Sequence, residues 1–190
     1  MKTAALVLTA VTALSPPALA QSKTSPPPAP GSSQGGQATP QARVHIYGHV
    51  YIGERAPDFS LDGSDGKIVR PSRFRGEWVV MVFADRKEKL GPLAAIHDEM
   101  RTLGVHIFGV CKEKAHTLQK YSTRQRLPFV LGADWTGEIS AMYGLYDSER
   151  SISPGFLVVD REGIVRMALL GHNLPPEQIA ALVRYGVAGP

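Results

Sequence analysis

The sequence contains one cysteine, Cys111, in the stretch GVCKEK that follows an apolar run. A cysteine thiolate is a nucleophile and a redox group, and neighbouring cations lower its pKa. Because Lys112 and Lys114 follow Cys111 closely, one interpretation is a catalytic thiol that works with an external reductant. The simpler interpretation is a small side chain that is buried like any hydrophobe. A chain with one cysteine forms no intramolecular disulfide.

A second candidate region is the stretch FADRKEKLGPLAAIHDE, Phe83 to Glu99, which leaves an apolar run, crosses a charged loop and enters a predicted helix. The N-terminus of a helix supplies partial positive charge and free N–H groups, which suit a reactive anion. Residues 84–101 nevertheless contain no Cys, Ser or Thr. The junction therefore has a favourable position for chemistry but none of these nucleophiles.

Two other kinds of site would depend on histidine and basic side chains. His45 and His49 lie on one face of a predicted strand, about 13 Å apart by the strand rise, which is too far for one shared metal ion. Arg86, Lys87 and Lys89 precede the predicted helix and are candidates for holding a small anion, but Pro92 removes one N–H donor there. We expect exposed histidines and a solvated loop, with no metal site and no cofactor.

The elements that would position these residues follow from hydrophobic periodicity. Residues 78–84 and 105–110 are apolar throughout or nearly so, as is typical of strands covered on both faces of a parallel sheet. Apolar residues recur at helical spacing from Pro92 to Leu103, so the three segments predict a right-handed βαβ unit. In such a sheet Cys111 and the loop after Phe83 share the carboxyl edge, where ligands bind.

The remaining elements are predicted from alternation, turn residues and caps. We expect strands or hairpin arms at 45–53, 56–61, 67–70, 129–134, 154–160 and 164–170, a helical turn at 71–76, and helices at 114–127, 136–144 and 176–185. Thr136 is expected to cap its helix, and Gly144 and Gly186 to follow helix ends. Mixed strands with helices on both faces predict an α/β protein with a three-layer α/β/α fold and a central mixed sheet.

The N-terminal segment has a different composition from the rest. A basic residue, an apolar run from Ala4 to Leu14 and Ala18-Leu19-Ala20 form the layout of a secretory signal peptide, residues 1–20. Residues 21–43 are rich in Pro, Ser and Gly and are predicted to be a disordered linker. Residues 44–190 have the size of one domain. We therefore expect a periplasmic or secreted protein with no membrane segment after cleavage.

Charge excludes one class of partner. The net charge is +4 and the pI is ≈ 9.3, but Lys and Arg are scattered among acidic residues and form no basic run. A nucleic-acid surface requires basic residues gathered on one face. We expect no nucleic-acid partner, and the composition does not predict an oligomeric state.

Several stretches, in order, resemble the peroxiredoxin branch of the thioredoxin superfamily, also called the alkyl hydroperoxide reductase/thiol-specific antioxidant or redoxin family. They are GERAPDFSLDGSDGKIVRPSRFRGEWVVMVF, VHIFGVCKEK, LPFVLGADWTGEISAMYGL and PGFLVVDREGIV, between Gly53 and Val165. The resemblance implies a thioredoxin-like fold and an antioxidant oxidoreductase activity supported by a thiol-redox partner protein.

The resemblance also locates the family's chemistry, and there this chain departs from it. The family's peroxidatic cysteine lies in the pattern Pro-x-x-x-Thr-x-x-Cys, and here Asp85 falls at the proline, Lys89 at the threonine and Pro92 at the cysteine. The family's later arginine is also replaced, by Pro154. A proline at that place resembles the cis proline that faces the redox cysteines of thioredoxin-like reductases. We therefore predict that the Ser153–Pro154 peptide bond is cis.

Two functions remain open from the sequence. In the first, an exported peroxiredoxin-like protein is degenerate as a peroxidase and acts as an accessory or binding module in redox homeostasis, with the Pro-rich arm as another contact. In the second, it is a thiol-dependent antioxidant oxidoreductase with Cys111 as the working thiol. The two are distinguished by whether Cys111 opens onto the cleft beside Lys89 and Pro154 or is sealed in the core.

Overall fold

The computed structural model describes residues 50–146 and 151–188, which belong to the unit Arg43–Pro190. Its strands are β1 Leu61–Gly63, β2 Ile68–Val69, β3 Trp78–Ala84, β4 Val105–Cys111, β5 Val130–Ala133, β6 Gly155–Val159 and β7 Val165–Leu170. Its 3₁₀ helices are η1 Pro71–Phe74, η2 Lys87–Lys89 and η3 Gly91–Ile96, and its α-helices are α1 His97–Thr102, α2 Ala115–Gln125, α3 Glu138–Met142 and α4 Pro176–Ala188.

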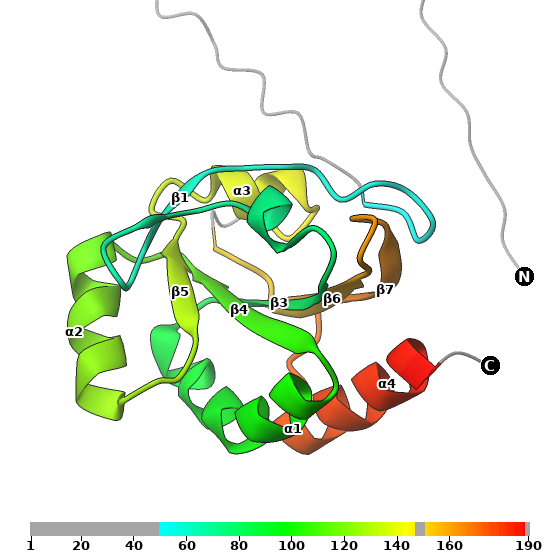
Figure 1. The fold of residues 1–190 in the computed structure, drawn as a ribbon. Helices are drawn as coiled ribbons and strands as arrows, with labels where there is room; N and C mark the ends of the chain where they lie inside the picture. The colour runs from blue at the N-terminus through cyan, green and yellow to red at the C-terminus, as the bar shows by residue number, and fades with distance from the viewer. Residues whose placement is uncertain (1–49, 147–150, 189–190) are drawn as a thin grey trace, which may run out of the picture. The chain divides into compact units, whose positions relative to one another are not determined.

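The strands form one mixed sheet of seven, in the order β2-β1-β5-β4-β3-β6-β7 (Figure 1). β3, β4 and β5 are parallel, whereas β6 is antiparallel to β3, and the β1–β2 and β6–β7 hairpins are antiparallel. The predicted βαβ unit and the β6–β7 hairpin are confirmed; the first hairpin also forms, but its first strand is Leu61–Gly63 and not residues 56–61. Cys111 pairs with Ala84 on one side and Ala133 on the other, so its backbone lies inside the sheet.

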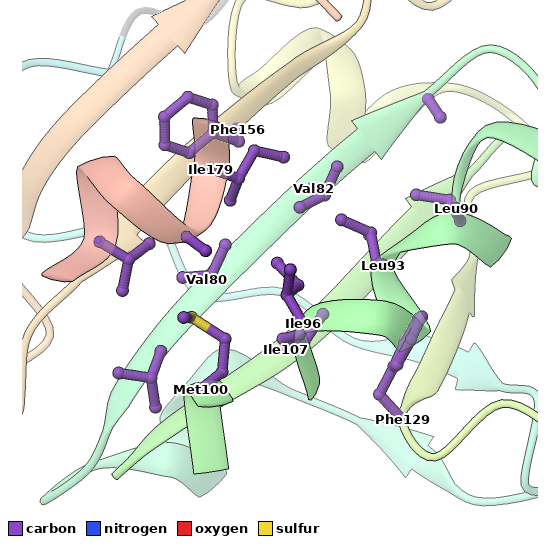
Figure 2. Close-up of a cluster of buried hydrophobic side chains, with 14 of the residues drawn as sticks. Val80, Val82, Leu90, Leu93, Ile96, Met100, Ile107, Phe129, Phe156 and Ile179 are labelled. Atoms are coloured by element: carbon purple, nitrogen blue, oxygen red, sulfur yellow. The ribbon is translucent and has the colours of Figure 1, made fainter. Parts of the chain in front are cut away.

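Side chains of the central strand β3 alternate between the two faces of the sheet. Val80 and Val82 pack in the cluster covered by α1, α2 and α4, which Figure 2 shows. Met81 and Phe83 pack on the other face, beneath α3 and residues 56–60. Helices on both faces of a mixed sheet confirm the three-layer α/β/α fold, and the unbroken apolar run of β3 follows from its cover on both sides.

The helix predicted from Pro92 to Leu103 has a different beginning. Residues Gly91–Ile96 form a 3₁₀ helix, and regular α-helix starts only at His97. The preceding residue, Leu90, has no side-chain acceptor for the first N–H groups, so the start lacks the cap that an α-helix prefers. Leu93, Ile96 and Met100 are nevertheless buried as their spacing predicts, and Leu103 is half-buried.

Two further predictions need correction. The strand expected at 45–53 is not formed in its described part, because residues 50–53 lead into a turn in which Glu54 N donates to Tyr51 O; residues 45–49 lie outside the described part. The last helix does not end before Gly186 but continues to Ala188. A glycine lowers helix stability by only about 1 kcal/mol, which the packed helix tolerates.

The start of α3 is held by Asp134 rather than by the predicted cap, Thr136. The Asp134 carboxylate is buried and accepts hydrogen bonds from Ile139 N at 3.2 Å, Ser140 N at 2.8 Å and Ser140 Oγ at 2.7 Å. Thr136 Oγ1 receives only a long contact from Glu138 N, at 3.4 Å. Asp134 directly follows a strand, and the sequence pattern did not identify it as a helix cap.

This difference gives a testable prediction for stability. We expect Asp134→Ala to lower the free energy of unfolding by about 2–3 kcal/mol, because several buried donors lose their acceptor. Urea unfolding measures the change. Thr136→Ala is the matched control and is expected to cost less than about 0.5 kcal/mol. An equal or larger effect of Thr136→Ala would contradict the assignment.

Candidate functional site

The positions that the resemblance assigns to the family's reactive site lie in the loop after β3. Lys89 Nζ lies 2.6 Å from Asp85 Oδ1, and both side chains are about one-third exposed, at 31% and 30%. Asp85 Oδ1 receives no hydrogen bond of regular geometry, but the short distance between opposite charges makes this an ion pair. Burial is the largest single influence and raises the pKa of Asp85, but the close contact with Lys89, the Asp85 backbone and the charge of Arg86 together leave that pKa below its usual value.

A second ion pair joins this loop to the residues after β4. Lys87 Nζ lies 2.9 Å from Glu113 Oε1 and 3.2 Å from Glu88 Oε1. The hydrogen bond to Glu113 is the main reason that the pKa of Lys87 is raised. Lys87 and Lys89 are thus each neutralised by an acidic side chain, and Arg86 makes only a loose contact with Asp85 at 3.8 Å. Because these basic side chains are already paired with acidic ones, the small-anion site that the sequence suggested in this loop is disfavoured.

The side chain of Cys111 is buried beneath this loop. Its side chain is 0% exposed and belongs to the cluster covered by α1, α2 and α4. Burial is the main cause that raises the pKa of the Cys111 thiol to about 12; Glu113 raises it further, and Lys87 lowers it by less. A thiol with this pKa is almost entirely protonated near neutral pH.

The lysines expected to activate the thiol make other contacts. Lys112 Nζ lies over the Tyr146 ring, 5.2 Å from its centroid. Lys114 Nζ lies over the Trp135 ring at 4.8 Å. The structure therefore corrects the interpretation in which these two lysines favour a thiolate at Cys111.

Tyr121 packs against the buried cluster that contains Cys111, Gly91 lies beside Tyr121, and the sequence analysis named neither as a site residue. A Cβ atom on Gly91 would lie 2.5 Å from Tyr121 Oη, so a larger residue at this position would require the Tyr121 side chain to shift. Burial, and then the charge of Glu88, raise the pKa of Tyr121. The only signal in the sequence was the helical spacing of Tyr121, which predicts an inward position but not its partner.

A hollow of ≈ 550 Å³ adjoins the same loop. Lys89 and Pro92 line one side of it, and residues 173–176 at the start of α4 line the other. Its apolar lining residues include Leu93 and Ile179. Cys111 is not among the residues that line the hollow, so any ligand there lies against charged and apolar side chains and not against a thiol.

Pro154 lies at the same edge of the sheet. It precedes Gly155, which pairs with Phe83, so Pro154 stands opposite the end of β3. Its carbonyl accepts a hydrogen bond from Gly171 N at 2.8 Å. The structure thus brings Asp85, Pro154 and Cys111 to one edge, as the sequence predicted, while the cis Ser153–Pro154 bond stays a prediction.

The described part of the chain holds neither a metal cluster nor a membrane-spanning helix. Residues 50–146 and 151–188 contain no group of three or more His, Cys, Asp or Glu side chains placed to hold a metal ion. His45 and His49 lie outside these residues. Within the same ranges, no helix has the length and apolar character needed to cross a bilayer.

The fold and the site define the class of protein. Solved structures with the same fold include a mutant of the PrxQ of Xylella fastidiosa, with a TM-score of 0.65 at 13% identity over 72% of this chain and 96% of that one. The reduced 2-Cys peroxiredoxin of Plasmodium vivax gives a TM-score of 0.62 at 18% identity, over 71% and 81% of the two chains. The chain is therefore a thioredoxin-like protein with the fold of the peroxiredoxins.

Its sequence identifies the family. The profile of the AhpC/TSA family matches residues 52–168, which is more than half of the chain, so the protein belongs to that family. A chloroplastic peroxiredoxin Q of Triticum aestivum is 26% identical over 141 residues, and the selenocysteine-containing peroxiredoxin PrxU of Peptoclostridium acidaminophilum is 25% identical over 134 residues. These matches cover 70% and 62% of this chain but only 64% and 66% of the relatives, which is just under two thirds of their length.

Proposed function

We propose that this is an exported peroxiredoxin-like protein that has kept the family's fold, has lost its thiol peroxidase reaction, and serves as an accessory or binding module in redox homeostasis. One observation carries the proposal: the only thiol of the chain, Cys111, is 0% exposed beneath a loop that is closed by ion pairs. The proposal of export to the periplasm or outside the cell rests on the sequence of residues 1–20.

The chemistry of peroxide reduction supports the loss of activity. A thiolate must attack the peroxide oxygen, so the thiol must be both ionised and accessible. With a pKa of about 12, about one Cys111 in 10⁵ is ionised at pH 7, before access is considered. At the position where the family's pattern places the cysteine, Pro92 has no group that can be oxidised by this route.

The hollow beside Lys89 and Pro92 supports a binding role. Its volume of ≈ 550 Å³ falls within the range of about 300–1,000 Å³ found for small-ligand sites. Its lining combines apolar side chains with the charged Arg86, Glu88 and Lys89. In the proposed function, this hollow and the carboxyl edge of the sheet recognise a partner or ligand without chemical turnover.

The second candidate, a thiol oxidoreductase that uses Cys111 and a thiol-redox partner protein, has one supporting observation. Cys111 ends β4 at the carboxyl edge of the parallel strands, where α/β proteins place their ligands. For this function the loop over Cys111 would have to open, and the ion pair from Lys87 to Glu113 would have to break.

Peroxide consumption distinguishes the two functions. Hydrogen peroxide loss is measured with dithiothreitol as reductant for the wild type and for Cys111→Ser. The proposed function predicts that both proteins match the protein-free blank. Consumption by the wild type that Cys111→Ser abolishes would establish the thiol oxidoreductase instead.

A further inference from the structure

A groove lies at the end of the sheet opposite Cys111, where β4 begins. β4 starts at Val105, but its pairing with β5 starts only at Phe108, opposite Val130. Residues 105–107 therefore pair with β3 on one side and have no β5 residue on the other. The chain enters β5 through Pro128, which has no N–H to donate. The result is a groove of ≈ 400 Å³ beside the first residues of β4.

The floor of the groove is apolar and belongs to the core. Val105, Ile107 and Phe129 are 3%, 6% and 7% exposed and line the groove together with Phe74. Figure 2 shows Ile107 and Phe129 among the buried side chains of one face of the sheet. Because these side chains are fixed by packing, the floor offers a preformed apolar surface to a ligand.

The polar lining of the groove is basic. Its charged or titratable lining residues are His97, Arg101 and His106, and none of the described lining residues is acidic. Asp98 is 90% exposed and makes loose contacts with His97 at 3.4 Å and with Arg101 Nε at 3.9 Å. Exposed contacts of this length contribute little, so Asp98 leaves the Arg101 guanidinium open to a stronger partner.

A second acidic residue also lies near the groove. Glu77 pairs with His106 Nε2, and the His106 ring packs on Phe74, with 5.3 Å between the ring centroids. His106 is thus already engaged at one side of the groove. Arg101, whose side chain is 75% exposed, is the basic group that remains for an incoming anion.

We propose that this groove binds a small apolar carboxylate, such as a medium-chain fatty acid, with its tail on Val105, Ile107 and Phe129 and its carboxylate at Arg101. The volume suits a ligand of this size, since small-molecule sites hold about 300–1,000 Å³. An arginine matches a carboxylate because its planar guanidinium donates two parallel hydrogen bonds. The groove lies at the amino ends of the parallel strands, so the proposal is independent of the function proposed for the carboxyl edge.

Calorimetric titration of the full chain with octanoate tests the proposal. Octanoate is expected to bind with one-to-one stoichiometry, and 1-octanol, which has a similar tail without the charge, is expected to bind at least 10-fold more weakly. Arg101→Gln is expected to weaken octanoate binding at least 5-fold, and Asp98→Asn to strengthen it. Arg184→Gln is the matched control and should leave binding unchanged, because Arg184 pairs with Glu99 at 3.3 Å and does not line the groove.

The position of binding is read from amide chemical shifts. Octanoate should shift the amides of Val105, Ile107 and Phe129, and should leave Leu174 and Ile179 at the other hollow unchanged. Three results would overturn the proposal: no binding up to millimolar octanoate, equal binding of octanoate and 1-octanol, or shifts confined to Leu174 and Ile179. Circular dichroism confirms that each variant is folded, as expected for substitutions at exposed side chains.

Discussion

In the native protein at pH 8, we expect iodoacetamide to modify Cys111 at least about 10³-fold more slowly than in the protein unfolded in urea. Iodoacetamide reacts with the thiolate, and a rise of the pKa from about 9 to about 12 lowers the thiolate population by about three powers of ten. The side chain is also 0% exposed, so the reagent reaches it only when the cover opens.

The experiment is direct because the chain contains no other cysteine, so all bound label reports on Cys111. A matched control places an exposed thiol in the same protein, as Thr136→Cys in a Cys111→Ala background. That control should react at nearly the same rate folded and unfolded. If native Cys111 is labelled at a rate within about 10-fold of the unfolded rate, the thiol is accessible, and this result would contradict the burial of Cys111.

The second large effect is a loss of stability at alkaline pH. The folded state holds Cys111 protonated with a pKa of about 12, whereas the unfolded chain ionises this thiol near its ordinary value of 9.0. The unfolded state therefore binds fewer protons above pH 9, and stability falls as pH rises from about 9 to about 12. At about 1.4 kcal/mol per pKa unit, we expect Cys111 to account for a loss of about 2–3 kcal/mol between pH 8 and pH 11.

The Cys111 contribution is isolated by comparison with Cys111→Ala. At pH 8 this variant is less stable than the wild type because it removes a buried side chain. Since alanine does not titrate, the free-energy difference should shrink as pH rises. Burial, and then the charge of Asp58, also raise the pKa of Tyr143, but this contribution is present in both proteins and cancels. A difference that stays constant from pH 8 to pH 11 would contradict the assignment.

The scaffold of the site could be predicted because its signals are local. The apolar runs of β3 and β4 specify buried parallel strands, and parallel strands end at a common edge. The pairing of Ala84 with Cys111 follows from that geometry. The sequence therefore placed Cys111 and the loop that holds Asp85 at one edge, whereas Pro154 was placed there only by the family resemblance.

The closure of the site could not be predicted, because it depends on pairs that are distant in sequence. Lys87 and Glu113 are separated by 26 residues, and the contact of Tyr121 with Gly91 joins α2 to the start of η3. Neighbouring lysines suggested an activated thiol, but they lie over aromatic rings instead. Helical spacing predicted which side chains of residues 92–103 are buried, but not that the first turns are 3₁₀.

Under the proposed function, this protein keeps the fold of its family without the family's reaction. The core of the sheet uses apolar side chains on both faces and does not depend on a reactive cysteine. By the resemblance, the Asp85–Lys89 ion pair stands at the proline and threonine positions of the family's pattern, and Pro92 stands at its cysteine position. We therefore expect selection on this protein to act on its surfaces and hollows and not on a thiol.

The central claim is tested most directly by the rate at which Cys111 reacts with hydrogen peroxide. The native protein and glutathione are treated with peroxide in separate tubes without added reductant, and the mass of the peptide that contains Cys111 follows the addition of oxygen to the protein thiol. We predict that Cys111 is oxidised no faster than glutathione, whose thiol has no help from a protein site. Oxidation of Cys111 several powers of ten faster than glutathione would show an intact peroxidatic centre and would contradict the account.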